Sequence, residues 1–269
     1  MNEVSRKEAL EAGTVLGGVA RAPVFVQRFG RGRTGGSTLG DLLIQLARGA
    51  GREQLIGDGD LRNPTLADLY PPGTPGGASQ PSTGEIPDVR DWITGLLAEA
   101  VARRISLLID MGGGDRVMQE FGRDLALVRF CERKGIEPLA LYMTGPDKDD
   151  FDHVLAIWRA GFFRPKRSIL VLNEHLVPQG RTGTTAFAAV RARPELQEMR
   201  AEGMKAIMMP RLPCMKEMRE AGLSFLDALA NKPGCDGKPL DPVRQFMIEE
   251  WVEQMQAEFK SAGAEEWLP

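Results

Sequence analysis

The sequence predicts an α/β fold, a doubly wound and mainly parallel sheet with helices on both faces. Two observations support this prediction. Short apolar runs suited to buried strands alternate with amphipathic stretches, a pattern typical of right-handed βαβ units. The chain also has 269 residues, of which 42% are hydrophobic and 26% charged, as expected for a globular protein with one well-buried core.

The predicted elements follow one another in a regular order. Each predicted strand is a short apolar run, and the six runs are residues 23–29, 54–58, 105–110, 137–143, 168–173 and 205–209. Amphipathic helices are predicted between and after them, at 38–49, 88–103, 117–134, 149–160, 186–202 and 215–230. Segment 71–87 is too rich in Pro and Gly for a core element, so we expect a flexible surface loop there, or alternatively a mobile lid.

Three parts are predicted along the chain: an N-terminal extension over 1–20, a main domain over 21–235 and an amphipathic helix within 236–269. Residues 1–10 contain acids and no continuous apolar run, which argues against a secretory signal. No apolar run approaches the roughly 18 residues of a membrane span. We therefore expect a cytoplasmic protein without membrane attachment.

The C-terminal stretch 241–260 has an apolar stripe at helical spacing, formed by Val243, Phe246 or Met247, Trp251, Met255 and Phe259. The same stretch contains five acidic residues and two basic ones, so its net charge is 2 − 5 = −3. Anionic lipid would repel such a segment. Docking on the domain or on a partner is therefore expected.

A Gly-rich segment, Gly30-Arg-Gly-Arg-Thr-Gly-Gly-Ser-Thr38, joins the first predicted strand to the first predicted helix. It has the frame of a phosphate-binding P-loop, GxxxxGK[ST], with Gly36 in the place of the lysine. Backbone N–H groups in such a loop can surround an anion, and the helix N-terminus adds a partial positive charge. The segment therefore predicts an anion site without its usual ammonium group, with a tight strand-to-helix turn as the alternative.

Acidic residues follow two of the predicted strands. Asp58 and Asp60 follow the second strand, and Asp110 ends the third. Ligands of open parallel sheets bind at the carboxyl ends of the strands, where a carboxylate can hold Mg²⁺ next to a bound phosphate. Helix capping or a solvated turn is the alternative for each acid taken alone.

Taken together, these motifs resemble those of the ParA/MinD family of P-loop ATPases, and the resemblance extends from about residue 22 to about 230. Arg31 occupies the position of the family's signature lysine, and Asp58-Gly-Asp60-Leu-Arg-Asn63-Pro-Thr-Leu66 matches its Asp-x-Asp motif. Leu108-Ile-Asp110-Met-Gly-Gly113 is similar to its third motif. Two later strand ends, at Asn173 and at Pro210-Arg211, are similar to the parts of the family that face the nucleotide.

The resemblance implies ATP and Mg²⁺ as cofactors. The backbone of Gly30, Gly32, Arg33, Thr34, Gly35, Gly36 and Ser37 would hold phosphate, and Thr38 would contact the α-phosphate. Ser37 would ligate Mg²⁺, Asp110 would hold the metal indirectly through its ligands, and Asp60 is a further metal residue. Asp60, with Asp58 beside it, would position the attacking water, and Asn173, Pro210 and Arg211 would face the nucleotide.

The missing lysine charge leaves two arginines to consider. Arg31 would act across a dimer interface on the partner's phosphates, and Arg33 would substitute within the same chain. Solvated loop arginines are the alternative reading.

The function implied by the resemblance is a ParA-like, ATP-dependent homodimer, acting with a partner protein in plasmid partition, plasmid maintenance or conjugative transfer. Nonspecific DNA binding is also implied, for which the basic clusters are Arg159, Arg164, Lys166 and Arg167, with Arg191 and Arg193 further on. A noncatalytic scaffold that retained the fold is the alternative from another class, and an ATP-dependent ligase is the third. Whether the nucleotide is ATP or GTP stays open at this point.

Overall fold

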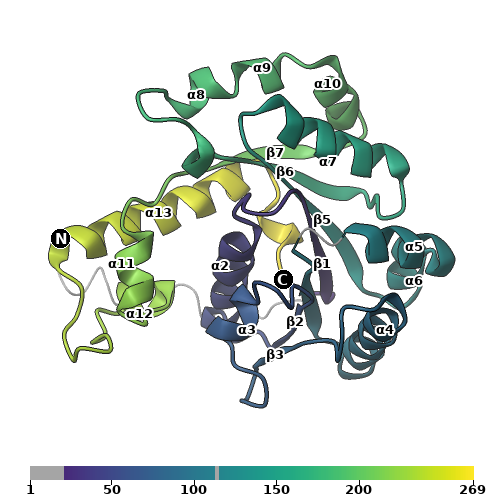
Figure 1. Cartoon of the computed structure of the whole chain (residues 1–269), viewed down its shortest axis with the longest axis horizontal. Helices are drawn as coiled ribbons and strands as arrows, with labels where there is room; N and C mark the ends of the chain where they lie inside the picture. The colour runs from purple at the N-terminus through teal and green to yellow at the C-terminus, as the bar shows by residue number, and fades with distance from the viewer. Residues whose placement is uncertain (1–20, 113–114) are drawn as a thin grey trace.

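The computed structural model describes residues 21–112 and 115–269, and the predicted N-terminal extension at 1–20 lies outside them. Its centre is one seven-stranded sheet in the order β3-β2-β4-β1-β5-β6-β7, in which every neighbouring pair is parallel (Figure 1). The strands are β1 (Val24–Phe29), β2 (Gln54–Asp58), β3 (Ala78–Ser79), β4 (Ser106–Asp110), β5 (Glu137–Thr144), β6 (Arg167–Asn173) and β7 (Lys205–Met209). The predicted fold class is confirmed.

Helices cover both faces of this sheet, and each face has its own apolar core (Figure 1). One face packs against α4 (Ile86–Arg103), α5 (Asp115–Leu125), α6 (Leu127–Arg133), α7 (Lys148–Ala160), α8 (Gly183–Ala186), α9 (Ala188–Arg191) and α10 (Pro194–Ala201). The other packs against α2 (Gly36–Gly49), α3 (Thr65–Leu69), α11 (Met215–Glu220), α12 (Phe225–Leu229) and α13 (Pro242–Ser261). Two short 3₁₀ turns, η1 (Glu174–Leu176) and η2 (Glu265–Trp267), complete the described elements.

Strand β1 lies in the middle of the sheet, between β4 and β5. Its side chains alternate between the two cores, with Phe25 and Phe29 in one and Val24 and Val26 in the other. By the same alternation Arg28 points to the face that α2 covers. A loop that follows this strand therefore begins at the centre of the sheet's carboxyl edge.

Three of the predicted helices are interrupted in the structure. The predicted helix 117–134 is divided at Ala126, which has a φ of 49°, and 215–230 is divided near Gly222, which has a φ of 68°. The predicted helix 186–202 forms three short helices, and Pro194 begins the last of them. The apolar periodicity continues across each break, so periodicity alone predicted single helices.

Segment 71–87 differs from the prediction that it contains no core element. Its residues Ala78 and Ser79 form β3, which pairs in parallel with β2, and Ala78 is buried. The Trp92 indole in α4 donates a hydrogen bond to the Ser79 hydroxyl over 2.9 Å. A contact with a helix that follows in the chain thus helps to place an edge strand that its own composition does not indicate.

The C-terminal helix α13 packs against the domain beside β7 (Figure 1). Trp251, Met255 and Phe259 of the predicted stripe are buried, whereas Val243 and Phe246 are exposed. No helix in the described part of the chain is long and apolar enough to cross a membrane.

Candidate functional site

The loop between β1 and α2 has the backbone shape that its glycines suggest. Gly30 has a φ of 142°, and a Cβ atom there would lie 2.7 Å from the Met143 carbonyl oxygen. Gly35 has a φ of 86° and precedes the first turn of α2, which contains no acidic residue. A side chain at either position would be strained. The N-terminus of α2 has no side-chain cap, which is typical of helix ends that bind anions.

The middle of the loop is held by hydrogen bonds inside the protein. The Thr34 hydroxyl donates to the Arg31 carbonyl over 2.7 Å, and the buried Asn173 amide donates to the Thr34 carbonyl over 2.9 Å. Arg33 is exposed and has a φ of 68°, a left-handed conformation that is costly for a residue with a side chain. Gly32 is also exposed, with open space where its Cβ would be.

Ser37 and Asp110 meet beneath the loop. The Ser37 hydroxyl donates to Asp110 Oδ2 over 2.6 Å. The Gly112 amide donates to Asp110 Oδ1 over 2.9 Å. The structure therefore brings together two of the residues predicted to bind metal.

A third residue completes this cluster, and the sequence analysis did not single it out. Arg28 of β1 is buried, and its Nε atom donates to Asp110 Oδ1 over 3.0 Å. Its Nη2 atom donates to the same oxygen, and its Nη1 atom lies 3.4 Å from the Gly30 carbonyl oxygen. Burial raises the pKa of the Asp110 carboxyl, but the Arg28 charge and the Ser37 hydrogen bond outweigh burial, so the net shift is downward. The Arg28 guanidinium therefore favours the charged form of the Asp110 carboxyl.

Asp58 lies directly opposite Asp110 in the register of β2 and β4. Its Oδ1 atom accepts from the Asp60 amide over 3.1 Å, and its Oδ2 atom accepts from the Ala67 amide in α3 over 2.9 Å. Burial raises the pKa of Asp58 to about 6, against these backbone hydrogen bonds and with a smaller contribution from Asp110. Both oxygens of Asp58 therefore hold the turn that leads into α3.

Asp60 is more accessible than Asp58 and lies in the same turn. Its Oδ1 atom accepts from the amides of Arg62 and Asn63 over 3.2 and 3.1 Å. Its Oδ2 atom lies 2.3 Å from where a Cβ on Gly112 would be, so the carboxylate faces the backbone that follows β4. Of the two acids of the Asp-x-Asp motif, Asp60 is the one with an oxygen directed away from its own turn.

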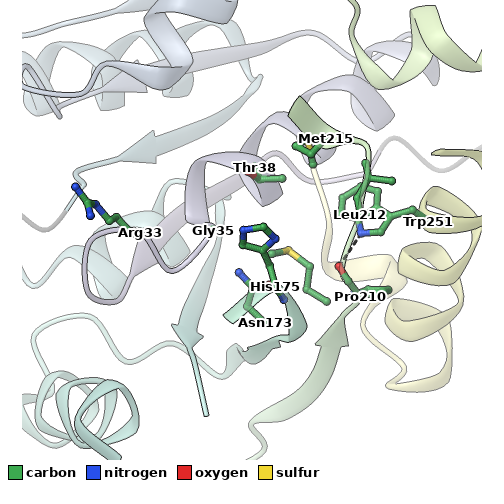
Figure 2. Close-up of a pocket in the computed structure, with 10 residues that line it drawn as sticks. Arg33, Gly35, Thr38, Asn173, His175, Pro210, Leu212, Met215 and Trp251 are labelled. Atoms are coloured by element: carbon green, nitrogen blue, oxygen red, sulfur yellow. Dashed lines mark hydrogen bonds between the residues drawn. The ribbon is translucent and has the colours of Figure 1, made fainter. Parts of the chain in front are cut away.

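A pocket adjoins the loop on the side of β6 and β7 (Figure 2). In Figure 2, Asn173 and His175 lie beside Gly35, whereas the Arg33 side chain points away from them. The Trp251 indole of α13 donates to the Pro210 carbonyl over 2.8 Å, which ties the C-terminal helix to this wall. The lining residues are Arg33, Gly35, Thr38, Asn173, His175, Met209, Pro210, Leu212, Met215 and Trp251.

Two of the predicted nucleotide-facing side chains have partners within the protein. Asn173 donates to Thr34 and accepts from the His175 amide over 2.9 Å, so its amide group joins the phosphate loop to η1. The Arg211 guanidinium donates to three carbonyl oxygens, those of Glu174, His175 and Val177. Asn173 lines the pocket, whereas Arg211 is not among its lining residues.

Arg31 lies on the exposed side of the loop, and half of its side chain is accessible. Its Nη1 atom is 3.3 Å from Asp150 Oδ1 in α7. The Asp150 side chain is only 15% exposed, but the Arg31 end of the pair is open to solvent, which weakens the pair.

Four of the six residues in the predicted basic clusters are paired with acids. Arg159 faces Glu198, Arg164 faces Glu202, and Arg167 faces Glu137. Arg193 lies 3.0 Å from Asp152 and 2.9 Å from Glu195. Each carboxylate reduces the positive potential that a DNA backbone would meet.

Direct ligation of Mg²⁺ by Asp110 does not fit this arrangement. Asp110 has Arg28 and the Gly112 amide on one oxygen and Ser37 on the other. The Arg28 guanidinium would repel a divalent cation next to Asp110. It also neutralises the carboxylate charge that would attract such a cation. Within the described residues, no three acidic, histidine or cysteine side chains are grouped so as to hold a metal ion.

Arg28, His175 and Trp251 were not among the predicted site residues. The signal for Arg28 was available, because it is a charged residue inside a run predicted to be a buried central strand, and buried charges require a partner. His175 and Trp251 carried no comparable signal, because only the folded chain places α13 and η1 beside the loop.

Comparison with solved structures finds distant similarities. The signal recognition particle receptor FtsY from Elizabethkingia anophelis in complex with GDP matches with 13% identity and a TM-score of 0.44, over 68% of this chain and 60% of that one. This chain thus covers less than two thirds of that receptor. Cell division protein FtsY from Thermotoga maritima matches with 17% identity and a TM-score of 0.45, over 93% and 76% of the two chains.

A structure of the PezAT toxin-antitoxin system of Streptococcus pneumoniae matches with 14% identity and a TM-score of 0.28, over 97% of this chain and 98% of that one. No protein-family model matches the chain, and no curated protein matches its sequence. Similarities this distant show no family for this chain.

Proposed function

We propose that this protein binds ATP, with the phosphates on the loop Gly30–Thr38 and the base in the adjoining pocket. The observation that supports this most is the position of the loop, because its glycines and the N-terminus of α2 lie at the carboxyl end of the central strand. Ligands of open parallel sheets bind at this edge. The loop amides supply the donors that a polyphosphate needs.

The pocket beside the loop suits a planar, partly apolar group. Met209, Leu212, Met215 and Trp251 supply apolar surface, and His175 adds a polar ring at the edge. Pockets for cofactors are lined in this way, with few polar groups that fix orientation. A phosphate at the loop and a base in this pocket would occupy one continuous site, since Gly35 and Thr38 belong to both.

The second candidate is binding without hydrolysis, as in a noncatalytic scaffold that responds to nucleotide. Binding without hydrolysis is favoured because the carboxylates of Asp58 and Asp110 already have partners within the protein. Asp58 uses both oxygens on backbone amides, and Asp110 is paired with Arg28. Asp60 is the remaining acid for positioning a water molecule, so any turnover would depend on it.

The finer proposal follows the ParA/MinD resemblance: an ATP-dependent homodimer that acts with a partner protein in plasmid partition, maintenance or conjugative transfer. The exposed Arg31 supports this proposal, because its weak pair with Asp150 leaves it available to a second subunit's phosphates. Light scattering with and without ATP tests the dimer. A monomer at saturating ATP contradicts it.

A charge introduced into the loop tests the proposed function. Gly32→Asp adds a carboxylate in open space, so the fold should be unaffected while the carboxylate repels phosphate. We expect saturable binding of a fluorescent ATP analogue by the wild type and a loss of about tenfold or more in the variant. Phosphate release measured on the same samples separates turnover from binding alone.

Gly84→Asp is the matched control, because Gly84 is also exposed with open space at its Cβ position but lies before α4. It should bind as the wild type does. Absence of binding by the wild type, or equal affinity of Gly32→Asp and Gly84→Asp, contradicts the proposed function.

A further inference from the structure

Helix α13 has large apolar side chains on two sides of its first half. The side that packs on the domain is buried, and its apolar residues are Ile248, Trp251, Val252, Met255 and Phe259. On another side, Val243, Phe246 and Met247 are 62%, 59% and 37% exposed. Their spacing places these three residues, the α13 patch, on one face of the helix. Helices that are apolar all round are normally buried all round, so this face lacks the cover that its composition requires.

The α13 patch gathers most of the exposed apolar side chains of the molecule. Four large hydrophobic side chains are exposed in the described residues, and three of them form the patch. The fourth, Leu61, lies in the turn that follows β2. Single exposed apolar residues are common on any protein surface, whereas a contiguous group marks an interaction site.

The helix turn that bears the patch is capped and fastened to the domain. The Asp241 carboxylate accepts hydrogen bonds from the amides of Val243 and Arg244, both over 3.1 Å. The Arg244 guanidinium lies 3.8 Å from Glu217 in α11. In Figure 1 this part of α13 lies at the periphery of the molecule, with α11 and α12 on one side of it. The patch is therefore presented on an ordered helix, which lowers the entropy cost of binding a partner.

Acidic side chains lie next to the patch. Glu249, Glu250 and Glu253, the acidic rim, are exposed, and none of them forms an ion pair within the described part of the chain. Residues 241–254 contain one base and four acids, so their net charge is 1 − 4 = −3. This charge would repel a second copy of the same surface and also an anionic membrane, but it would attract a basic segment.

We propose that the α13 patch binds a basic amphipathic helix of a partner protein. The apolar side of that helix packs on the patch, and its Lys or Arg side chains meet the acidic rim. Amphipathic helices are commonly recognised in this way, by apolar anchors with complementary charge around them. Nucleotide binding and this interaction use different sides of α13, because Trp251, which lines the pocket beside the loop, lies on the buried side.

Two synthetic peptides test the choice of partner. Both are fluorescein-labelled amphipathic helices of about 18 residues with Leu on one side, and the other side has Lys in one peptide and Glu in the other. We expect fluorescence anisotropy to show that the full chain binds the Lys peptide about tenfold or more tightly than the Glu peptide, with a difference that decreases as salt is added. Equal affinities, or no binding of the Lys peptide, overturn the proposal.

The double variant Phe246→Ser with Met247→Ser tests the patch. Both side chains are exposed, so the variant should stay folded while its affinity for the Lys peptide falls about tenfold or more. Leu61→Ser is the matched control, because it removes the exposed apolar side chain that lies outside the patch. Equal affinity of the double variant and Leu61→Ser overturns the role of the patch.

The triple variant Glu249→Gln, Glu250→Gln and Glu253→Gln tests the acidic rim. We expect it to bind the Lys peptide about fivefold or more weakly than the wild type does, and with less dependence on salt. Glu265→Gln with Glu266→Gln is the control, because these acids are exposed but lie beyond the end of α13. A triple variant that binds as the wild type does overturns the preference for a basic partner.

Two further measurements test other occupants of the patch. Sedimentation equilibrium without nucleotide reports self-association, and flotation with phosphatidylglycerol vesicles reports membrane binding. We expect the wild type and the double variant Phe246→Ser with Met247→Ser to behave alike in both. Self-association or vesicle binding that this variant abolishes overturns the proposal in favour of a second copy or a membrane.

Discussion

Asp58 and Asp110 end neighbouring strands and lie opposite each other in register, yet the protein treats them differently. Both are buried. Asp110 has a guanidinium beside it and a lowered pKa, whereas Asp58 has only backbone amides and a pKa raised to about 6. The two acids share a position at a strand end but differ in the direction of their pKa shifts. The difference shows that a neighbouring cation, and not the position in the strand, decides that direction.

Removing the acid of the paired site has the largest expected effect. Asp110→Asn leaves Arg28 as a buried charge without its counterion, and breaking such a pair costs about 3–5 kcal/mol. Urea denaturation measures the loss in the free energy of unfolding. Adding Arg28→Met to the variant should recover most of it, and a single variant as stable as the wild type contradicts a buried ion pair.

A substitution at Gly112, whose amide donates to Asp110, should have a smaller effect on stability than Asp110→Asn. Gly112→Ala forces a side chain onto a φ of 60° and places its Cβ 2.3 Å from Asp60 Oδ2, which should cost about 1–3 kcal/mol. The control is Gly95→Ala in α4, where nothing lies within 4 Å and alanine should stabilise by about 0.5–1 kcal/mol. Thermal melts of the two variants should shift in opposite directions, and equal shifts contradict the close approach.

The pH dependence of stability is expected to have opposite signs for the two acids. The pKa of Asp58 is about 6 in the folded protein and about 4 in the unfolded chain, so the folded state holds more protons between these values. Wild-type stability should therefore rise relative to that of Asp58→Asn as the pH falls from about 7 to about 4. The pKa of Asp110 is lowered in the folded protein, so its carboxylate stabilises the fold at pH values above its pKa in the unfolded chain. This stabilisation is lost as the pH falls below about 4.

Urea titrations of the wild type and Asp58→Asn across this pH range give the difference directly. A difference that does not change with pH would show that Asp58 titrates at the same pKa in both states. The Asn side chain keeps one acceptor for the turn into α3, so the two proteins remain comparable.

Much of the fold was predictable because its signals are local. Buried parallel strands read as short apolar runs, so β1, β2, β4, β5, β6 and β7 lie within about one residue of their predicted ends. The strand β3 was not predictable, because pairing with β2 and the contact of Trp92 place it rather than its own composition. The helix breaks at Ala126 and Gly222 also depend on backbone conformations that periodicity does not report.

The candidate site was predictable in its frame and not in its chemistry. The glycines of the loop and the acids at the strand ends follow from residue type and spacing. Arg31 and Arg33 were the predicted sources of positive charge, whereas the buried cation is Arg28. The sequence places Arg28 two residues before the loop, but its contact with Asp110 spans 82 positions.

The amino-acid sequence by itself determined the parallel α/β sheet, the glycine loop after the first strand and the acids at the strand ends, because each depends on neighbouring residues. Only the tertiary structure decided that Asp110 pairs with Arg28 and that the Arg28 side chain fills the space beside Gly36. It also decided that α13 lies beside the pocket, where Trp251 bonds Pro210. The physical reason is that charge pairing, close packing and burial act between residues that are adjacent in space and distant in the chain.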